Sequence, residues 1–389
     1  MAAPLKKRLG RFKRQMAKII VLAICHLLLA ICAFAQEPNF IRVAIIQDAS
    51  SVRLKINGFY EAIDSKSQKV IFRGKNLNTT VTAYPAGILL GNARSNTPKL
   101  LFKPTNPEAI TINERTFRGA IQFIRKDNLH LAAINFIDLE DYIQGILYHE
   151  VSHYWPDEAL KAQSVVSRTY AVYQRQASYA RDFDVTSDIY SQVYGGKTSE
   201  RYRTSAAVDA TRGEVLTYKG KSFPSYYHAT CAGHTEDAAL LWNIDITPLK
   251  GVPCGFCKNS PHFNWHAVLT GTLVKAALTK AGYALSGDIR DIKMLGSDVS
   301  GRITKLRILS GAKETVIEAK DLRNILGPNL IRSTNFIVHV ISRDVVFEGF
   351  GWGHGVGLCQ WGAYFMAKEG RSYKQILEYY YPGSRVETF

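Results

Sequence analysis

The chain has 389 residues, of which 46% are apolar, and a formal net charge of +16 at pH 7. This apolar fraction is enough to build sizeable buried cores. The excess of positive charge favours an anionic partner such as a cell-wall polymer or an anionic membrane surface. We do not expect nucleic acid to be the partner, because beyond residue 35 there is no dense Lys/Arg run and no recognisable nucleic-acid-binding motif.

The first 35 residues have the pattern of a secretory signal peptide. A head with seven Lys and Arg residues precedes an apolar run over residues 19–31, and Ala33 and Ala35 supply the small residues expected before a cut at Gln36. The apolar run is short for a membrane span. We therefore expect an exported protein of the periplasm or cell-wall space, with a formal charge of +9 once the seven basic residues are removed. Retention of the signal as a membrane tether is the alternative.

Removing 35 of the 389 residues leaves 354, which is more than one compact core usually holds. Short alternating apolar runs predict a β-rich N-terminal lobe over residues 36–125, with Asn57 and Gly58 as a hairpin turn. Residues 126–389 mix helical and strand-like patterns, and we expect the catalytic region there. The predicted fold class is α+β with more than one lobe.

Two helices are predicted on either side of Glu150. Asp138 is the expected N-cap of the first helix, which should end close to Glu150. Pro156 suits the first position of the second helix, which carries Arg168 midway along its length. A buried arginine needs a carboxylate partner, and Glu150 is the candidate for Arg168.

Later segments also have readable patterns. A hairpin is predicted over residues 213–221, and helices are predicted over residues 205–211, 319–326, 360–368 and 373–380.

One motif suggests zinc-peptidase chemistry. His149-Glu150-Val151-Ser152-His153 matches H-E-x-x-H, in which a helix holds two imidazoles one turn apart on zinc. The motif needs continuous helix around both histidines, whereas Trp155-Pro156 follows almost at once. Zinc-peptidase activity is therefore the weaker alternative.

A series of blocks in fixed order carries a family resemblance. The first two blocks are Tyr142–Glu150 and Glu158–Ala171, and the later ones are Ser191–Gly195, Tyr227–Glu236, Gly301–Arg302, Leu322–Gly327 and Gly353–Ala363. Together they resemble the SpoIID/LytB domain of stage II sporulation protein D and the amidase enhancer. The likeness spans about Ile41 to Gly383.

The resemblance implies a peptidoglycan lytic transglycosylase that acts on glycan strands stripped of their stem peptides, with Glu150 as the catalytic acid. Glycoside hydrolases usually need two carboxyl groups. A lytic transglycosylase can work with one, which protonates the glycosidic oxygen and then takes the proton of the muramic acid 6-hydroxyl as that hydroxyl closes a 1,6-anhydro ring. Glu150 must then start protonated, so we expect an apolar pocket, with Tyr148, Tyr154 and Trp155 as the nearest candidates in sequence.

The amidase-enhancer branch of the family implies a different role. In this alternative the protein is a non-catalytic wall-binding module that assists a cell-wall amidase.

Polar residues of the matching blocks are candidates for the sugar groove, although each could equally brace a loop. Among them, Tyr194 could stack on a pyranose face. The predicted substrate-binding residues are Arg168, Gln192, Tyr194, His228, Thr235, Glu236, His354 and Gln360.

Four cysteines follow residue 35, and family members carry zinc near this region. Cys231, Cys254 and Cys257, completed by His234, are the predicted ligands of a structural zinc. His228 and His262 are alternative fourth ligands, and a disulfide or free thiols are the alternatives to a metal. No cofactor is expected for catalysis. Two positions depart from the family pattern, because Ser191 stands where cysteine is common and Cys359 where serine is common.

Overall fold

The computed structural model describes residues 39–388. The predicted signal segment, residues 1–35, lies outside the described residues. From Ile41 onward the described residues form one compact unit. Within this part of the chain, no helix combines the length and apolarity that a membrane crossing requires.

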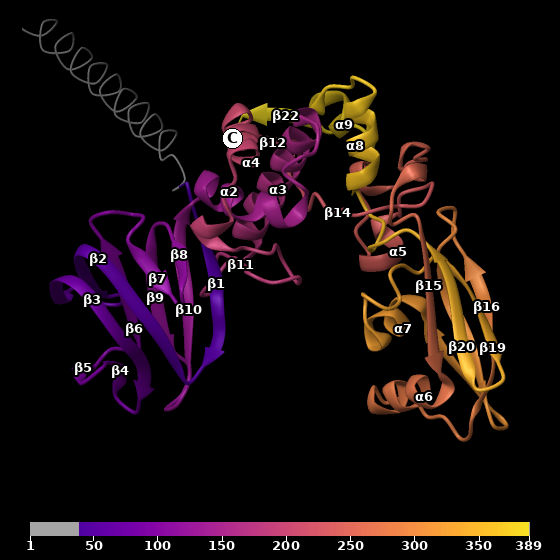
Figure 1. Ribbon diagram of the computed structural model, residues 1–389, viewed down its shortest axis with the longest axis horizontal. Helices are drawn as coiled ribbons and strands as arrows, with labels where there is room; N and C mark the ends of the chain where they lie inside the picture. The colour runs from indigo at the N-terminus through magenta and orange to yellow at the C-terminus, as the bar shows by residue number, and fades with distance from the viewer. Residues whose placement is uncertain (1–38, 389) are drawn as a thin grey trace, which may run out of the picture. The chain divides into compact units, whose positions relative to one another are not determined.

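The N-terminal region is one large sheet, as the alternating pattern predicts (indigo to magenta in Figure 1). Its strand order is β11-β1-β10-β9-β6-β2-β3-β4-β5, with β7 pairing to β2 and β8 to β7. The strands are β1 (Phe40–Ala49), β2 (Ser51–Asp64), β3 (Val70–Tyr84), β4 (Gly87–Leu90), β5 (Ala93–Ser95), β6 (Lys99–Pro104), β7 (Ile110–Ile112), β8 (Arg115–Phe117), β9 (Ala120–Arg125), β10 (Leu131–Asp138) and β11 (Val185–Thr186).

Two details of this sheet differ from the sequence prediction. The sheet continues past residue 125, because β9 and β10 form an antiparallel hairpin and β11 joins β1 in parallel. Asn57 and Gly58 do not form a hairpin turn but lie inside β2, where the register against β3 shifts between Ile56 and Phe59. Gly58 has a φ of +89°, a conformation that suits glycine at a β-bulge.

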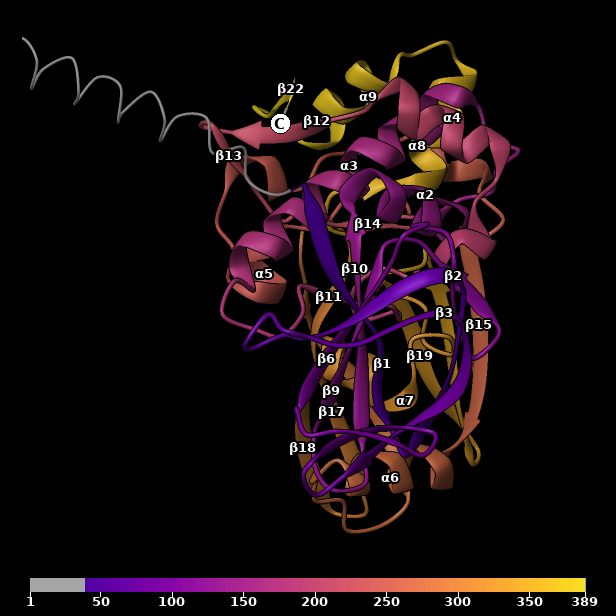
Figure 2. The ribbon, with the colours of Figure 1, turned by 90° about the vertical axis from the view of Figure 1, so that its left-hand side faces the viewer.

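The two predicted helices around Glu150 are present. Helix α2 (Leu139–Glu150) starts after Asp138, whose side chain accepts a hydrogen bond from the amide of Glu140. Helix α3 (Asp157–Ala177) has Pro156 as its N-cap residue, so the helix starts one residue later than predicted. Helices α2, α3 and α4 (Tyr202–Ala210) pack together beside the large sheet (Figures 1 and 2).

Helix α3 lies between two cores. Ala171 and Val172 belong to the core of the large sheet. Val165 and Val166 belong to a second core, which α8 (Gln360–Lys368) and α9 (Tyr373–Tyr380) complete from the far end of the chain. The segment after Glu150 therefore joins distant parts of the sequence.

The remaining elements form small sheets and a third core, built around Trp265, Leu306 and Phe347. β12 pairs with β13 and β22, and β14 pairs with β21; β15, β20 and β19 form one three-stranded sheet, and β16, β17 and β18 form another. These strands are β12 (Glu214–Tyr218), β13 (Lys221–Ser222), β14 (Tyr227–His228), β15 (Asn264–Thr270), β16 (Ile289–Ser297), β17 (Ile303–Ser310), β18 (Lys313–Glu318), β19 (Phe336–Ile341), β20 (Asp344–Phe350), β21 (Leu358–Cys359) and β22 (Arg385–Thr388). The helices are α5 (Ala238–Trp242), α6 (Gly271–Lys280) and α7 (Ala319–Leu326), with 3-10 turns at Gly196–Ser199, Thr247–Leu249 and Phe256–Asn259.

Candidate active site

Glu150 is the last residue of α2, and its side chain lines a cavity of about 380 Å³. Segments spread between residues 150 and 354 contribute to this cavity. Its lining residues are Glu150, Tyr170, Ile189, Tyr190, Ser191, Val193, Tyr226, Tyr227, Trp242 and His354. Among the described residues that line it, Glu150 has the only carboxyl group.

Two donors hold the carboxyl group of Glu150. The hydroxyl of Tyr227 and the backbone amide of Val193 both donate hydrogen bonds to it. Burial raises the pKa of Glu150 to about 7, and the two hydrogen bonds offset part of that rise. The group can therefore be protonated near neutral pH and still have donors ready for its ionised form.

A buried chain of side chains orients Tyr227. The hydroxyl of Tyr142 donates to Oε1 of Gln192 at 3.1 Å, and Nε2 of Gln192 donates to the hydroxyl oxygen of Tyr227 at 3.2 Å. Because the oxygen of Tyr227 accepts from Gln192, its own proton is free to point at Glu150. Gln192 thus acts behind the cavity wall and is itself only 1% exposed.

His354 lies in the cavity wall and is neutral. Its Nδ1 accepts a hydrogen bond from the amide of Val356 at 3.1 Å, and its ring also donates to the backbone carbonyl of Tyr227. Burial, together with the charges of Arg323 and Arg302, lowers the pKa of His354 to about 3. His354 therefore fixes the backbone of Tyr227 without adding charge to the cavity.

Aromatic side chains form much of the cavity wall. Trp242, the last residue of α5, is 41% exposed and packs against Tyr226 with ring centroids 4.4 Å apart. It also contacts His354 at 5.0 Å. Tyr190, from the loop after β11, is 85% exposed. An exposed aromatic face held by neighbouring rings is a suitable platform for the C–H groups of a sugar.

The predicted pairing of Arg168 with Glu150 is wrong. Arg168 is fully buried and forms two hydrogen bonds with Glu140 of α2, Nε to Oε1 at 2.8 Å and Nη2 to Oε2 at 2.7 Å. It also donates to the backbone carbonyls of Glu214 and Val208. Arg168 therefore ties helices together and cannot contact a substrate.

Tyr194 does not face the cavity either. Its ring is 1% exposed between Phe117 and Tyr142, and its hydroxyl donates to Asn135 at 2.9 Å. Stacking of Tyr194 on a sugar is excluded by this burial.

Three more predicted sugar contacts are loop braces. Thr235 is 1% exposed and exchanges hydrogen bonds with the backbone of Val252. Glu236 is 1% exposed and accepts a hydrogen bond from Ser300. His228 is 4% exposed, and its Nδ1 lies 3.1 Å from the carbonyl of Val356.

Gln360 supports Glu150 from behind. Its Nε2 donates to the backbone carbonyl of Glu150 at 3.2 Å and to Oε1 of Gln163 at 3.3 Å, and the residue is 8% exposed. Of the eight predicted substrate-binding residues, His354 alone lines the cavity.

The helical geometry of an H-E-x-x-H zinc site is not formed. Helix α2 ends at Glu150 with Val151 in an extended conformation, so His153 lies outside the helix. Nε2 of His149 lies 2.6 Å from the hydroxyl of Ser199, and the ring of His153 packs on Tyr154. The apolar pocket around Glu150 is not built from the residues predicted for it. Tyr154 is 78% exposed, and the cavity is lined instead by aromatic residues such as Tyr170, Tyr226 and Trp242.

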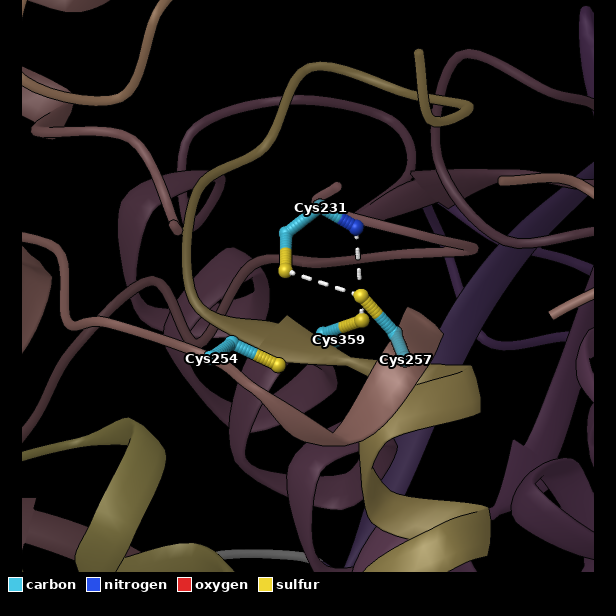
Figure 3. Close-up of side chains that lie close together, drawn as sticks. All are labelled: Cys231, Cys254, Cys257 and Cys359. Atoms are coloured by element: carbon cyan, nitrogen blue, oxygen red, sulfur yellow. Dashed lines mark hydrogen bonds between the residues drawn. The ribbon is translucent and has the colours of Figure 1, made fainter. Parts of the chain in front are cut away.

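The four cysteines of the described residues are free thiols that meet in one buried cluster, named here the thiol cluster: Cys231, Cys254, Cys257 and Cys359 (Figure 3). Their sulfur atoms all lie within 4.8 Å of one another. Four thiolates bound to zinc at about 2.3 Å would have sulfurs roughly 3.8 Å apart. The donor set and its spacing therefore fit a tetrahedral zinc.

His234 is not part of the thiol cluster. Its Nδ1 lies 2.6 Å from the carbonyl of Thr235, and Cys359 takes the fourth place instead. The sequence prediction missed Cys359 because it lies 102 residues after Cys257, beyond any local spacing rule. It also missed Tyr227 and Trp242, although an aromatic residue next to His228 in a matching block was an available signal for Tyr227.

The fold and cavity define a mixed α+β protein in which a single carboxyl group lies in an aromatic-lined pocket at a helix end. The profile "SpoIID: Stage II sporulation protein" matches residues 127–218, and a domain of unknown function, DUF8618, matches residues 254–357.

Relatives with sequence similarity to this chain include named members of the same family. The chain is 33% identical to an uncharacterized protein of Brachyspira hyodysenteriae, over 92% of this chain and 96% of that protein. It is 30% identical to stage II sporulation protein D of Bacillus subtilis, over 65% of this chain and 76% of that protein. It is 26% identical to the amidase enhancer of Bacillus subtilis, over 64% of this chain and 40% of that protein. The chain belongs to the SpoIID/LytB family, and this membership supports a cell-wall-related function.

Proposed function

We propose that this protein is an exported lytic transglycosylase that cleaves peptidoglycan glycan strands, with denuded strands as its substrate and Glu150 as its only catalytic carboxyl group. The observation that carries the proposal is that Glu150 is the single carboxyl group among the described residues of the cavity and has a pKa of about 7. A hydrolase would need a second carboxyl group across the cavity, at a separation of about 5–9.5 Å.

The proposed reaction uses Glu150 twice. The protonated carboxyl group donates its proton to the glycosidic oxygen, and the bond from that oxygen to the anomeric carbon of muramic acid breaks. The resulting carboxylate is stabilised by the hydroxyl of Tyr227 and the amide of Val193. It then accepts the proton of the 6-hydroxyl, whose oxygen bonds to the anomeric carbon. Glu150 is protonated again at the end, and no water is consumed.

The sugar platform in this proposal is Trp242. Its exposed face lies in the wall of the same cavity as Glu150, and its ring is held by Tyr226 and His354. Trp242 takes the role that the sequence assigned to Tyr194.

The test is to incubate the purified mature protein with denuded glycan strands and to analyse the products by mass spectrometry. Products that end in 1,6-anhydromuramic acid support the proposal. Strands that are bound but left intact support the wall-binding role suggested by the relative named amidase enhancer. Hydrolysed reducing ends would also contradict the proposed reaction, and comparison of intact with denuded sacculi tests the substrate preference.

We also propose that the thiol cluster holds one structural zinc. All four cysteines are buried, and none is in a disulfide. The backbone amides of Cys231 and Gly362 already point at the sulfur of Cys359, at 3.3 and 3.4 Å, as amides around metal-bound thiolates do. Bound zinc would supply cross-linking of these segments and no catalytic step.

A further inference from the structure

The short ribbon formed by β14 and β21 connects the thiol cluster to Glu150. In this ribbon Tyr227 pairs with Leu358, and His228 pairs with Cys359. Cys359 is the last residue of β21, and Cys231 follows β14 by three residues. One strand therefore ends in a member of the thiol cluster, and the other leads to a second member within three residues.

The same ribbon supplies two of the contacts that hold Glu150. The hydroxyl of Tyr227 in β14 donates a hydrogen bond to the carboxyl group. Gln360, the residue after β21, donates to the backbone carbonyl of Glu150 at 3.2 Å. Each contact is made at or next to one strand of the ribbon.

The sulfur of Cys359 also organises the start of α8. It accepts a hydrogen bond from the amide of Gly362, as the N-cap of this helix. It also accepts a hydrogen bond from the amide of Cys231, which follows β14. The backbone of Trp361 is tied to the carbonyl of Ala229 at 3.0 Å. The position of Cys359 thus sets the direction in which the side chain of Gln360 leaves the helix.

Two strands of two residues each have too few ladder hydrogen bonds to fix their own position. Four neutral thiols add only weak hydrogen bonds, whereas four metal–sulfur bonds fix distances and angles. The close approach of the two strands also depends on Gly357, because a Cβ there would lie 1.9 Å from the carbonyl oxygen of Tyr226.

We infer that the metal-bound thiol cluster is a clamp that positions Glu150, acting through Tyr227 on one strand and Gln360 after the other. The inference rests on the proposed function for its kinetic test and on the ribbon geometry for its structural test. Gln360 is a positioning residue and touches no substrate.

The experiment compares the zinc-loaded protein with protein that has been stripped by a chelator under reducing conditions. After stripping, we expect kcat on denuded strands to fall about tenfold while KM stays within about twofold, because displacement of a catalytic group affects the transition state most. Hydrogen exchange should become at least about tenfold faster over residues 226–232 and 356–362 but not over α3. Returning zinc should restore both.

The matched variant is Gln360→Ala, which leaves all four thiols in place. It should bind cobalt with the thiolate-to-metal charge-transfer bands of the wild type and still show the fall in kcat. Gln176→Ala, which removes an exposed glutamine whose side chain accepts a hydrogen bond from Ser222, should leave kcat and metal binding unchanged.

Unchanged kcat in Gln360→Ala would overturn the inference, and this variant decides the matter even if stripping unfolds the protein. A wild type that cleaves no strands would overturn the proposed function instead. In that case the clamp is tested by a pH titration of Glu150, in which NMR records the chemical shift of its carboxyl carbon with and without zinc. Loss of the Tyr227 contact should raise its pKa, and an identical titration would exclude the clamp.

Discussion

At the scale of single residues, the chemistry depends on how Glu150 is held. In the proposed reaction, burial favours the protonated form of this carboxyl group, while Tyr227 and Val193 would stabilise the carboxylate that forms after proton transfer. An acid that must also act as a base works best with a pKa near the working pH. Its pKa of about 7 meets this condition.

This pKa predicts the pH dependence of cleavage. The rate on denuded strands should fall as the pH rises through about 7, because Glu150 loses the proton that it must donate. Initial rates measured by product release between about pH 5 and 9 test this. Glu150→Gln should lose at least about a hundredfold in kcat while still binding strands. A rate that stays level up to the alkaline limit contradicts the assignment.

The same pKa predicts a pH-dependent cost in stability. The carboxyl group has an ordinary pKa of 4.5 and a folded pKa of about 7, so the folded state binds the proton more tightly than the unfolded state. The stability from this proton is fully present below pH 4.5 and is lost as the pH rises through 7. Relative to Glu150→Gln, the wild type should lose up to about 3 kcal/mol in free energy of unfolding between those limits. Urea denaturation of both proteins at several pH values measures this difference in free energy of unfolding. A difference that does not change with pH would show that the carboxyl group is solvated and would contradict the prediction.

Trp242 should affect affinity for glycan. Trp242→Ala removes the exposed ring in the cavity wall, and we expect KM for denuded strands to rise roughly two- to tenfold, the range that aromatic stacking commonly contributes. Trp242→Phe should recover part of the loss. Tyr179→Ala is the matched control, because Tyr179 is 89% exposed and lies outside the cavity. Equal effects of the two alanine substitutions would show that Trp242 has no special role.

At the scale of elements, the pairing of α2 with α3 depends on the buried ion pair between Glu140 and Arg168, whose side chains are 3% and 0% exposed. Glu140 also accepts the amide of Gly213, so the pair joins α2, α3 and the start of β12. The end of α2, and with it Glu150, is held in place by these contacts.

Arg168→Ala should destabilise the protein by about 3–5 kcal/mol, because it leaves the buried carboxylate of Glu140 without its partner. Chemical denaturation followed by circular dichroism measures the change. Arg212→Ala removes an arginine from the exposed pair with Asp209 and should cost less than about 1 kcal/mol. If Arg168→Ala folds as stably as the wild type but binds glycan weakly, the sequence prediction of a substrate contact was right after all.

At the scale of the whole molecule, the second core joins α3 to the last two helices of the chain, and all four cysteines are buried in it. A metal there would connect segments that are 128 residues apart in sequence, as Cys231 and Cys359 are. Binding free energy at such a site stabilises the folded state directly.

We therefore expect one zinc per chain by elemental analysis and a fall in the unfolding temperature after chelation. A Cys254→Ala, Cys257→Ala double variant should contain no zinc and unfold at the same lower temperature with or without chelator. Detection of a disulfide by mass spectrometry in the native protein, with no metal, would contradict the zinc proposal.

Local signals in the sequence determined the helices on both sides of Glu150, the strand-rich N-terminal region and the last two helices. Capping residues and apolar periodicity act over a few residues, so they can be read without the fold. The ordered blocks from Tyr142 to Ala363 identified the family and pointed to Glu150.

The tertiary structure alone decided what surrounds Glu150. Arg168 pairs with Glu140 and not with Glu150, Cys359 replaces His234 in the thiol cluster, and Tyr227 and Trp242 enter the cavity from distant segments. Burial, hydrogen bonding and ligand sets depend on which segments meet in space, and spacing along the chain does not fix that for residues a hundred positions apart.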